Sequence, residues 1–463
     1  MHKAARELVK LAGWRRVPGP RIWPVVGNPA ALSAPRDLIG FGEGYWQRYG
    51  DIFRVSLFNR SIVVLVHPNA IKHVLCTARE NYVRGSVYAS TRRLIGDSVL
   101  TLEGEAGRAR RELQQPAFHR SSVEKLAARM IASGARHCDA LAARARAGVV
   151  EIDAQREMAK LTLEVFVRAL FGQALSGDCD ALTQLMEEVS DGANRFMLPP
   201  WVPTPRNRRW QRAIALLDDR LCGLIEWARE HGSDDSLLSM LIAARDVDGA
   251  PLEDRAIRDE VMTLFVVGHE TMALTLTWLF ALVGRQRDVL PRMQREVGRV
   301  VGRRDPRFSD FAELRYLRQV IDETLRLRPP VPMLARDVVD HDSIHGYEVY
   351  AGEIAIPFIW ATHRHPDFWA DPLQFNPDRF EGPPPTQHSS WSYVPFSAGP
   401  RACMGEMFSL VETVLLLAQL LQRFELQIED CADVKPVMML SASARPSRPF
   451  RIWLRPRPRL TCI

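Results

Sequence analysis

Phe396-Ser-Ala-Gly-Pro-Arg-Ala-Cys-Met-Gly405 is the stretch of sequence that decides how this chain is interpreted. It places Cys403 in a loop punctuated by glycine and proline, two residues after Arg401. Residues 404–421, which follow, are apolar enough to predict a buried helix. The free N–H groups and the positive dipole end at a helix start favour a thiolate over a thiol. A thiolate is a soft, electron-donating ligand, so we expect Cys403 to bind a metal centre.

The spacing of this loop resembles the signature of the cytochrome P450 family of haem-thiolate monooxygenases, and the resemblance covers the chain from Pro18 onward. It implies a mostly α fold with a minor β portion (α+β), in which a long central helix lies over the haem beside a small β-sheet region. The implied cofactor is haem b (iron protoporphyrin IX), with the Cys403 thiolate as axial iron ligand. Phe396 and Gly405 are implied to contact the haem: the aromatic ring packs beside it, and the glycine lets the helix approach.

Composition places the chain among ordinary globular proteins. It has 463 residues, 46% of them hydrophobic and 25% charged, which is enough apolar sequence for a large core. The net charge of +6 is spread along the chain, so it predicts no nucleic-acid binding and suits an acidic protein partner instead. The 7 cysteines form no CxxC pair, a usage typical of a reducing compartment. We therefore expect a cytoplasmic protein, and we expect it to be a monomer.

No break in composition divides the chain, so we expect a single cytochrome P450 domain over residues 18–463. Residues 1–17 form an N-terminal extension with two open interpretations: a short basic amphipathic helix at a membrane surface, or a frayed or packed end. The extension has neither a signal-peptide pattern nor an apolar run long enough to cross a bilayer. We therefore expect no transmembrane segment.

Periodicity predicts helices separated by short β regions. The central helix is expected over residues 252–285, because this segment is apolar on nearly all sides. Strands are expected at 52–58 and 61–66, joined by a hairpin turn, and again between 331 and 358.

Two further features precede the central helix. One is a predicted helix over residues 180–195. The other is a proline cluster at 199–205, which is either a rigid surface linker or, by the resemblance, the connection between two lid helices.

The second motif, Val267-Gly-His-Glu-Thr271, lies inside the predicted central helix. Gly268 removes a side chain at a cost of about 1 kcal/mol in helix stability. Thr271 can hydrogen-bond back into the helix ladder, and with Glu270 it offers an alcohol and an acid for proton transfer. The matching pair in the family assists O–O cleavage, so the resemblance implies that Glu270 and Thr271 are catalytic and that Gly268 lies beside the haem. We expect His269 to be a core or surface histidine and not an iron ligand.

Haem carries two propionates that need cationic partners, and the resemblance assigns this role to Arg401, Arg336 and Arg111. Gly107 departs from the family pattern, because the early helix usually has Trp or His four residues before its arginine. The haem contact from that side is therefore expected to be absent or supplied elsewhere.

Two further sets of charged residues have roles implied by the resemblance. Glu323 and Arg326 lie one turn apart on a predicted helix, and with Arg379 of the proline-rich loop they are implied to form a structural network. Arg108 and Arg110 lie on the early helix and are candidates for docking an acidic redox partner, with two solvated arginines as the alternative.

The resemblance implies a monooxygenase that inserts one oxygen atom from dioxygen into a hydrophobic small molecule. The segment after Cys403 is too short for a fused reductase, so we expect electrons from a separate ferredoxin or flavodoxin with an NAD(P)H reductase. Two alternatives stay open: a peroxide-driven peroxygenase, against which Glu270 and Thr271 argue, and a non-catalytic haem-binding or sensor protein. The candidate pocket positions are largely apolar: Val87, Leu94, Leu264, Val267, Val331, Met333, Leu334, Leu440 and Ser441.

Overall fold

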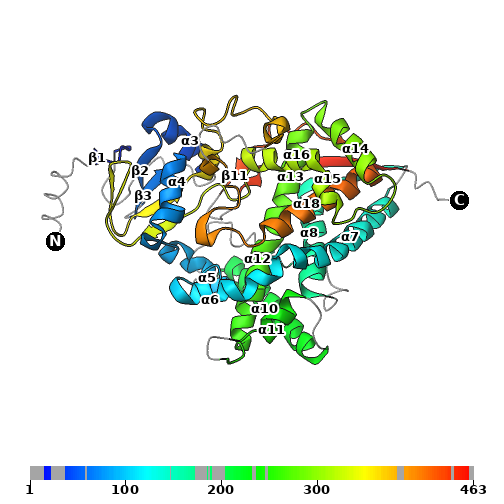
Figure 1. Cartoon of the computed structure of the whole chain (residues 1–463), viewed down its shortest axis with the longest axis horizontal. Coiled ribbons are helices and arrows are strands. Elements are labelled where there is room, and N and C mark those ends of the chain that lie inside the picture. Colours follow the sequence, from blue (N-terminus) through cyan, green and yellow to red (C-terminus); the bar gives the residue numbers. More distant parts are fainter. Residues whose placement is uncertain are drawn as a thin grey trace.

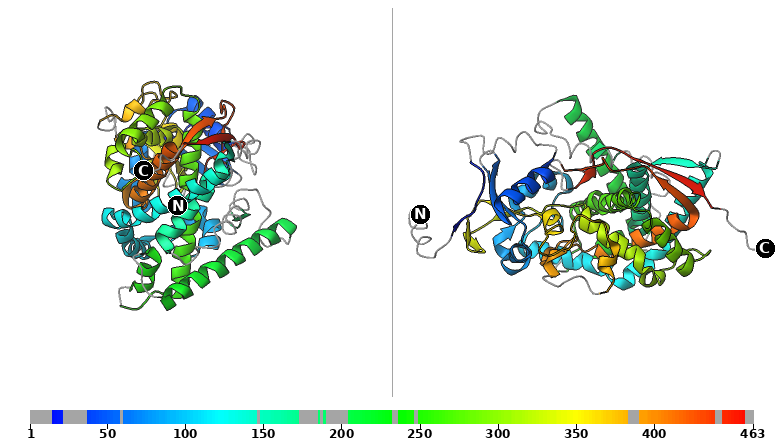
Figure 2. Two further views of the ribbon diagram at one scale, coloured as in Figure 1. Left: turned by 90° about the vertical axis from the view of Figure 1, so that its right-hand side faces the viewer. Right: turned by 90° about the horizontal axis from the view of Figure 1, so that it is seen from above.

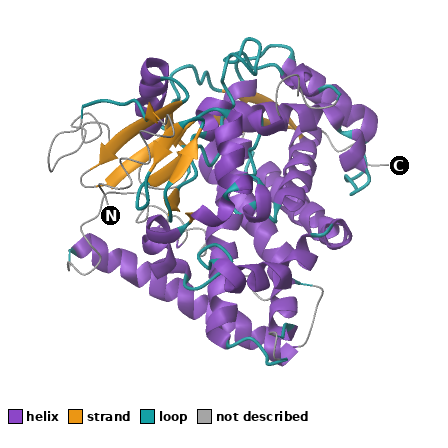
Figure 3. Cartoon of the chain, turned by 60° about the vertical axis from the view of Figure 1, so that its left-hand side comes forward, coloured by secondary structure: helices purple, strands orange, loops and turns teal. Residues whose placement is uncertain are grey.

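The computed structural model of the chain describes residues 15–21, 37–57, 60–145, 148–172, 185, 188–189, 204–231, 236–245, 249–382, 390–438 and 443–457. Figure 1 shows a large helical region beside a smaller sheet region near the N-terminus. Figure 3 shows the same division, with purple helices covering most of the molecule and orange strands gathered at one side. The expected architecture, mostly α with a minor β portion, is confirmed.

The helices agree in most places with the predicted segments, and local sequence explains several of their ends. Asp37 caps the first described helix by accepting a hydrogen bond from the N–H of Gly40 at 2.8 Å. The helix α16 ends at Leu327, just before two prolines that cannot continue it. The predicted helix over 180–195 and the proline cluster at 199–205 lie almost entirely outside the described residues. The α-helices are α3 (Leu38–Tyr49), α4 (Pro68–Lys72), α5 (Ala89–Ile95), α6 (Gly104–Gln114), α7 (Arg120–Ala143), α8 (Ala154–Phe171), α10 (Pro205–His231), α11 (Leu237–Ala243), α12 (Asp254–Gly268), α13 (Glu270–Val283), α14 (Val289–Val300), α15 (Asp310–Glu313), α16 (Arg315–Leu327), α17 (Ile359–Thr362) and α18 (Glu406–Arg423).

The strands form small sheets, of which the largest has the order β2-β3-β9-β6-β4. The predicted hairpin is its first pair, with Phe53 opposite Val64 in antiparallel register. Alternate residues of β3 face opposite sides: Val64 packs in the cluster that includes Ile39 of α3, and Val63 packs in the cluster on the other face. The strands are β1 (Arg15–Arg16), β2 (Ile52–Leu57), β3 (Arg60–Leu65), β4 (Tyr82–Val83), β5 (Val150–Asp153), β6 (Arg336–Val338), β7 (Asp342–Ile344), β8 (Tyr347–Val349), β9 (Ile354–Pro357), β10 (Phe424–Ile428), β11 (Pro436–Val437), β12 (Arg445–Pro446) and β13 (Arg451–Pro456).

The N-terminal boundary of the fold lies before residue 18. Arg15 and Arg16 form β1, which pairs in parallel with Tyr347 and Glu348 of β8. Val17 is buried in the sheet cluster. The last residues of the predicted extension are therefore part of the packed structure.

The central helix is interrupted, which corrects the prediction of one continuous helix over 252–285. α12 ends at Gly268, and α13 starts at Glu270 on the other side of His269. Both pieces contribute to the largest hydrophobic core, together with α7, α8, α16 and α18. By length and composition the segment Asp254–Val283 could cross a membrane, but 72% of its apolar window is buried inside the protein, as in the core helix of a soluble protein.

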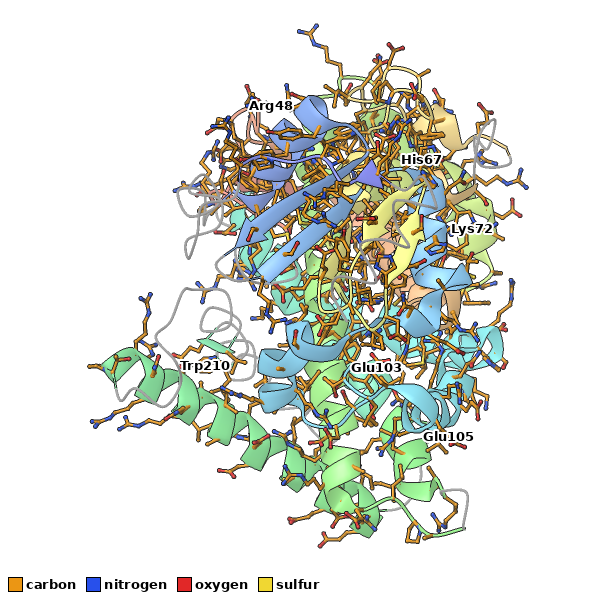
Figure 4. The ribbon with its side chains drawn as sticks, turned by 90° about the vertical axis from the view of Figure 1, so that its left-hand side faces the viewer. Arg48, His67, Lys72, Glu103, Glu105 and Trp210 are labelled. Atoms are coloured by element: carbon orange, nitrogen blue, oxygen red, sulfur yellow. The ribbon has the colours of Figure 1, made fainter. Side chains whose placement is uncertain are left out.

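The long helix α10 lies at the edge of the molecule, as the left panel of Figure 2 shows. One of its faces packs into the main core through Leu217, Leu221 and Leu224. Figure 4 shows Trp210 on α10, far from Glu103 beside the N-terminal end of α6. The site described next lies in the body, between α6, α12, α13 and the loop before α18.

Candidate active site

The loop that carries Cys403 has a backbone that its glycines and hydrogen bonds fix. The N–H of Cys403 donates to the carbonyl of Phe396 at 2.9 Å, which closes the loop. Gly399 has a left-handed φ of 72°. A Cβ there would lie 2.3 Å from the carbonyl oxygen of Leu75, so the close approach of two chain segments requires glycine. Gly405 precedes α18, with Cys403 Sγ 3.9 Å from the position that a Cβ on it would take.

Opposing influences act on the pKa of the Cys403 thiol. Cys403 keeps accessible surface, yet it is enclosed deeply enough that burial raises the pKa of its thiol. The backbone N–H of Gly405 and the charge of Arg111 lower this pKa, and the charge of Glu406 raises it further. A metal ion bound to the sulfur would lower this pKa and favour the thiolate.

Three arginines meet at one edge of the site, although only two of them were predicted. Burial lowers the pKa of Arg84 to about 10, and the charges of Arg336 and Arg401 add to this effect. Arg401 Nη2 lies 2.7 Å from Glu103 Oε2, and the backbone N–H of Arg84 donates to Glu103 Oε1 at 2.9 Å. The cluster of Arg84, Arg336, Arg401 and Glu103, here called the arginine cluster, thus contains three cations and one carboxylate.

Arg84 is held in place by main-chain carbonyls. Its Nη1 donates to the carbonyls of Val99 at 3.1 Å and Leu100 at 2.6 Å. Its Nε is buried and has no hydrogen-bond partner in the described part of the chain. A buried guanidinium with an unused donor suits an anionic ligand at this position.

Gly107 and Arg111 of α6 both lie close to the loop that carries Cys403. A Cβ on Gly107 would lie 2.7 Å from the carbonyl oxygen of Leu102 and 3.0 Å from Nη2 of Arg401. The backbone and Arg401 thus leave no room for a larger residue. Arg111 donates from Nη1 to the carbonyl of Ala402 at 2.9 Å, so its hydrogen bond supports the loop that carries Cys403. The propionate role of Arg111 stays a prediction.

The break in the central helix is supported by a neighbouring helix. Thr162 of α8 donates from its hydroxyl to the carbonyl of His269 at 3.2 Å. Thr271 donates weakly to the carbonyl of Val267, at 3.4 Å. The His269 ring contacts the carbonyl of Phe265 at 2.8 Å, and burial lowers the pKa of the imidazole. His269 is therefore a core histidine, as predicted.

Gly268 lies against a neighbouring helix. A Cβ on Gly268 would lie 2.3 Å from the ring of Phe166 on α8. The missing side chain allows the two helices to pack closely, and the position of Gly268 beside a haem stays a prediction. Val267 is 38% exposed, although most of the helix around it is buried. Val267 and Thr271 lie four residues apart and thus share one helix face, which places both at the open side of the site.

Glu270 binds the turn at residues 443–445, here called the C-terminal turn, and has no hydrogen bond to Thr271. Its Oε1 accepts from Ser443 Oγ at 2.9 Å. The same oxygen accepts from Arg445 Nε at 2.9 Å and from Arg445 Nη2 at 2.6 Å. Neither Ser443 nor Arg445 was identified from the sequence.

A carboxylate on α12 fastens the segment before α6. Glu260 accepts from the N–H of Val99 at 2.9 Å and from Gln114 Nε2 at 2.6 Å. Burial raises its pKa to about 7, although these donors and Arg110 act in the opposite direction. Arg110 Nη1 lies 3.6 Å from Glu260 Oε1 with a side chain only 16% exposed. Arg110 therefore faces inward, which leaves Arg108 as the exposed one of the two predicted docking arginines.

The predicted structural network is present. Arg326 and Glu323 are fully buried and form a two-bond fork, Nε to Oε2 at 2.6 Å and Nη2 to Oε1 at 2.7 Å. Arg379 Nε lies 3.4 Å from Glu323 Oε1. Arg326 also donates to the main-chain carbonyls of His363, Pro372 and Gln374. A buried charge with this many partners fastens the loop that leads toward Cys403.

The family model of cytochrome P450 matches residues 17–454. The chain belongs to the cytochrome P450 family. It is similar to cyclooctatin synthase of Streptomyces melanosporofaciens, with 31% identity over 94% of this chain and 95% of that protein. Its identity to pentalenene oxygenase of Streptomyces avermitilis is also 31%, over 93% of this chain and 95% of that protein. These matches make the chain a cytochrome P450 monooxygenase, an enzyme that uses dioxygen, a substrate and a redox partner.

Solved cytochromes P450 share the fold. Retinoic acid-bound cyanobacterial CYP120A1 superposes with a TM-score of 0.85 at 26% identity, covering 96% of this chain and all 100% of that one. The haem domain of cytochrome P450DA gives a TM-score of 0.86 at 25% identity, over 96% of this chain and 99% of that one. The family and the fold imply a haem with a cysteine thiolate ligand.

Proposed function

We propose that this cytochrome P450 binds haem b through Cys403 and inserts one atom of dioxygen into a hydrophobic small molecule. The observation that carries the proposal is the Cys403 loop, closed by the Phe396 carbonyl, with the arginine cluster nearby. Haem, when bound, supplies the activation of dioxygen with two electrons and two protons.

The charges of the arginine cluster fit this cofactor. Arg84, Arg336 and Arg401 bring three positive charges and Glu103 brings one negative charge, which leaves a surplus of two. Haem b carries two propionates, so the surplus and the cofactor match in charge. The buried, unpartnered Nε of Arg84 offers a further donor. We propose that Arg84, together with Arg336 and Arg401, holds the propionates and replaces the contact missing at Gly107.

Residues of the broken central helix are proposed to control substrate approach and proton transfer. Val267 is a β-branched side chain on the open face of the broken helix, and we propose that it limits how a substrate approaches the iron. Thr271, four residues further on the same face, offers a hydroxyl for proton transfer. Glu270 supplies the acid, although its carboxylate is held by the C-terminal turn.

We propose an isoprenoid-type substrate, apolar along most of its length. Pentalenene oxygenase and a retinoic acid-bound structure are among the similar proteins, and both names point to isoprenoid ligands. Val87 and Val331 remain candidate pocket residues. Leu94 and Leu264 lie in the main core, whereas Met333 and Leu334 pack against the two sheet clusters. Leu440 and Ser441 lie outside the described residues.

Electrons are proposed to come from a separate ferredoxin or flavodoxin with an NAD(P)H reductase. Arg108 on α6 is exposed and suits an acidic partner. We further propose a cytoplasmic monomer with one domain, which includes β1 because this strand pairs with β8.

A carbon monoxide difference spectrum tests the function. The reduced wild-type protein should give the red-shifted Soret band of a thiolate-ligated haem, and Cys403→Ser should lose it. Cys222→Ser is the matched control, because this cysteine is exposed on α10, outside the site. A band that persists in Cys403→Ser would refute the proposal.

Comparing turnover with a reductase system and with peroxide separates the monooxygenase from a peroxygenase. Product should form with the reductase system in the presence of dioxygen. Turnover with peroxide alone would favour the alternative.

A further inference from the structure

The two oxygens of the Glu270 carboxylate have different surroundings. Oε1 accepts all three hydrogen bonds that the structure gives this side chain, one from Ser443 and two from Arg445. Among the described residues Oε2 has no hydrogen-bond partner, and the side chain remains 22% exposed. One oxygen is therefore fixed, and the other stays available for proton exchange.

The residues that hold Oε1 are themselves fixed by the fold. The carbonyl of Ala444, between Ser443 and Arg445, accepts from Trp278 Nε1 of α13 at 2.9 Å. The N–H of Ala444 donates to the carbonyl of Pro330 at 2.8 Å. Ala444 is only 1% exposed. The turn is thus attached on both sides, so it presents the Arg445 guanidinium in a set position.

Arg445 donates from two nitrogens to a single oxygen, a charge-assisted contact that holds Oε1 of Glu270 in place. His269 is the neighbouring titratable group, and Glu270 and Arg445 act on it in opposite directions. Burial lowers the pKa of His269, so its imidazole is neutral at pH 7 and Arg445 is the cation that faces Glu270.

We propose that Arg445 and Ser443 are positioning residues for proton delivery: they hold Oε1 of Glu270 so that Oε2 alone passes protons toward the Thr271 hydroxyl. In each transfer Oε2 takes one proton from water and releases one toward the Thr271 hydroxyl, which regenerates the carboxylate. The inference rests on the proposed haem monooxygenase function and deepens it, because it links the C-terminal turn to the proton supply.

The test uses dioxygen as the only oxidant, with electrons from a surrogate ferredoxin and reductase, so that no substrate identity is needed. Reduction of dioxygen by two electrons and two protons gives hydrogen peroxide, whereas four of each give two waters. Impaired proton delivery should raise the share of peroxide. Arg445→Gln should lower the ratio of water to peroxide about tenfold, less than the 10²–10⁴-fold effect of removing a proton-transfer group outright. Arg445→Lys should restore part of the ratio.

The matched control is Arg448→Gln, an arginine of the same segment that pairs with Glu429 and Asp433. It should leave the ratio unchanged. Ser443→Ala should lower the ratio by a smaller factor, and it decides the question if Arg445→Gln does not fold. If Arg445→Gln folds and its ratio of water to peroxide equals that of wild-type, the inference is overturned. If Arg445→Gln does not fold, an unchanged ratio in Ser443→Ala overturns it.

A second measurement does not depend on turnover. The infrared difference spectrum between wild-type and Glu270→Gln isolates the carboxylate stretch of Glu270, whose two C–O bonds should be unequal. Arg445→Gln should make them more alike, and an unaltered band would overturn the inference. The carbon monoxide band should be intact in every variant. Its absence from the wild-type protein would instead refute the proposed function.

Discussion

Replacing the buried Glu412 should stabilise the protein, and increasingly so as the pH rises. Glu412 lies in the middle of α18 with 0% exposure, and neither carboxyl oxygen has a hydrogen-bond partner among the described residues. Burial alone raises the pKa of this carboxyl well above its ordinary value. A neutral polar group buried without a partner costs about 1–3 kcal/mol, so Glu412→Leu should raise the free energy of unfolding by about this amount below the ordinary glutamate pKa, and by more at neutral pH.

Glu412→Gln isolates the ionisation. A group with a raised folded-state pKa contributes stability that is full below its unfolded-state pKa and is lost as the pH rises through the folded-state pKa. While Glu412 stays protonated in the folded protein and ionised in the unfolded one, each pH unit costs wild-type about 1.4 kcal/mol. Between pH 6 and 8 the variant should therefore gain stability relative to wild-type, by up to about 2.7 kcal/mol.

Denaturant unfolding of equally haem-loaded proteins, followed by circular dichroism across this pH range, measures the difference. Glu425→Gln is the control, because Glu425 is exposed just after the same helix. Parallel stability curves for wild-type and Glu412→Gln would show that the carboxyl is charged and paired in the folded protein, contrary to the structure.

Three further predictions concern residues near the site. Glu260→Gln should flatten the pH dependence of unfolding: with its pKa raised to about 7, Glu260 contributes stability at low pH that falls by about 3 kcal/mol between the ordinary glutamate pKa and pH 7. A pH series of denaturant unfolding checks this, and a slope like that of wild-type would contradict it. Gly268→Ala should lower the free energy of unfolding by about 1–3 kcal/mol, because its Cβ would lie 2.3 Å from Phe166, and Phe166→Leu should rescue part of the loss in thermal melts. No rescue would mean that the contact is not the cause. Gly107→His should reduce haem content, measured by Soret absorbance per protein, because its Cβ would meet a backbone carbonyl at 2.7 Å and crowd Arg401; equal or higher haem content would show that α6 accepts a larger residue.

The sequence predicted features that depend on local patterns. The loop around Cys403, the hairpin of β2 and β3 and the apolar α18 follow from residues that are close in the chain. Glu323 and Arg326 were predicted as a pair because three residues on a helix bring them to one face.

Contacts between distant segments could not be predicted in the same way. The Phe166 ring explains Gly268, and Thr162 on the same helix supports the break at His269. Arg445 is 175 residues from Glu270, and no local pattern marks it as the partner of this acid. Such pairings depend on the packing of complete helices and turns, so the motif around Gly268 could not predict its contact with Phe166.

Arg326 also determines how freely the loop around it can change. Its guanidinium donates hydrogen bonds to the main-chain carbonyls of His363, Pro372 and Gln374, and every amino acid carries the same carbonyl group. Side chains at these three positions can therefore be exchanged without loss of that recognition, provided that the backbone keeps its path. The arginine itself has no such freedom, since lysine lacks the planar fork of donors. Exposed side chains of this loop could thus be redesigned, provided that Arg326 is kept.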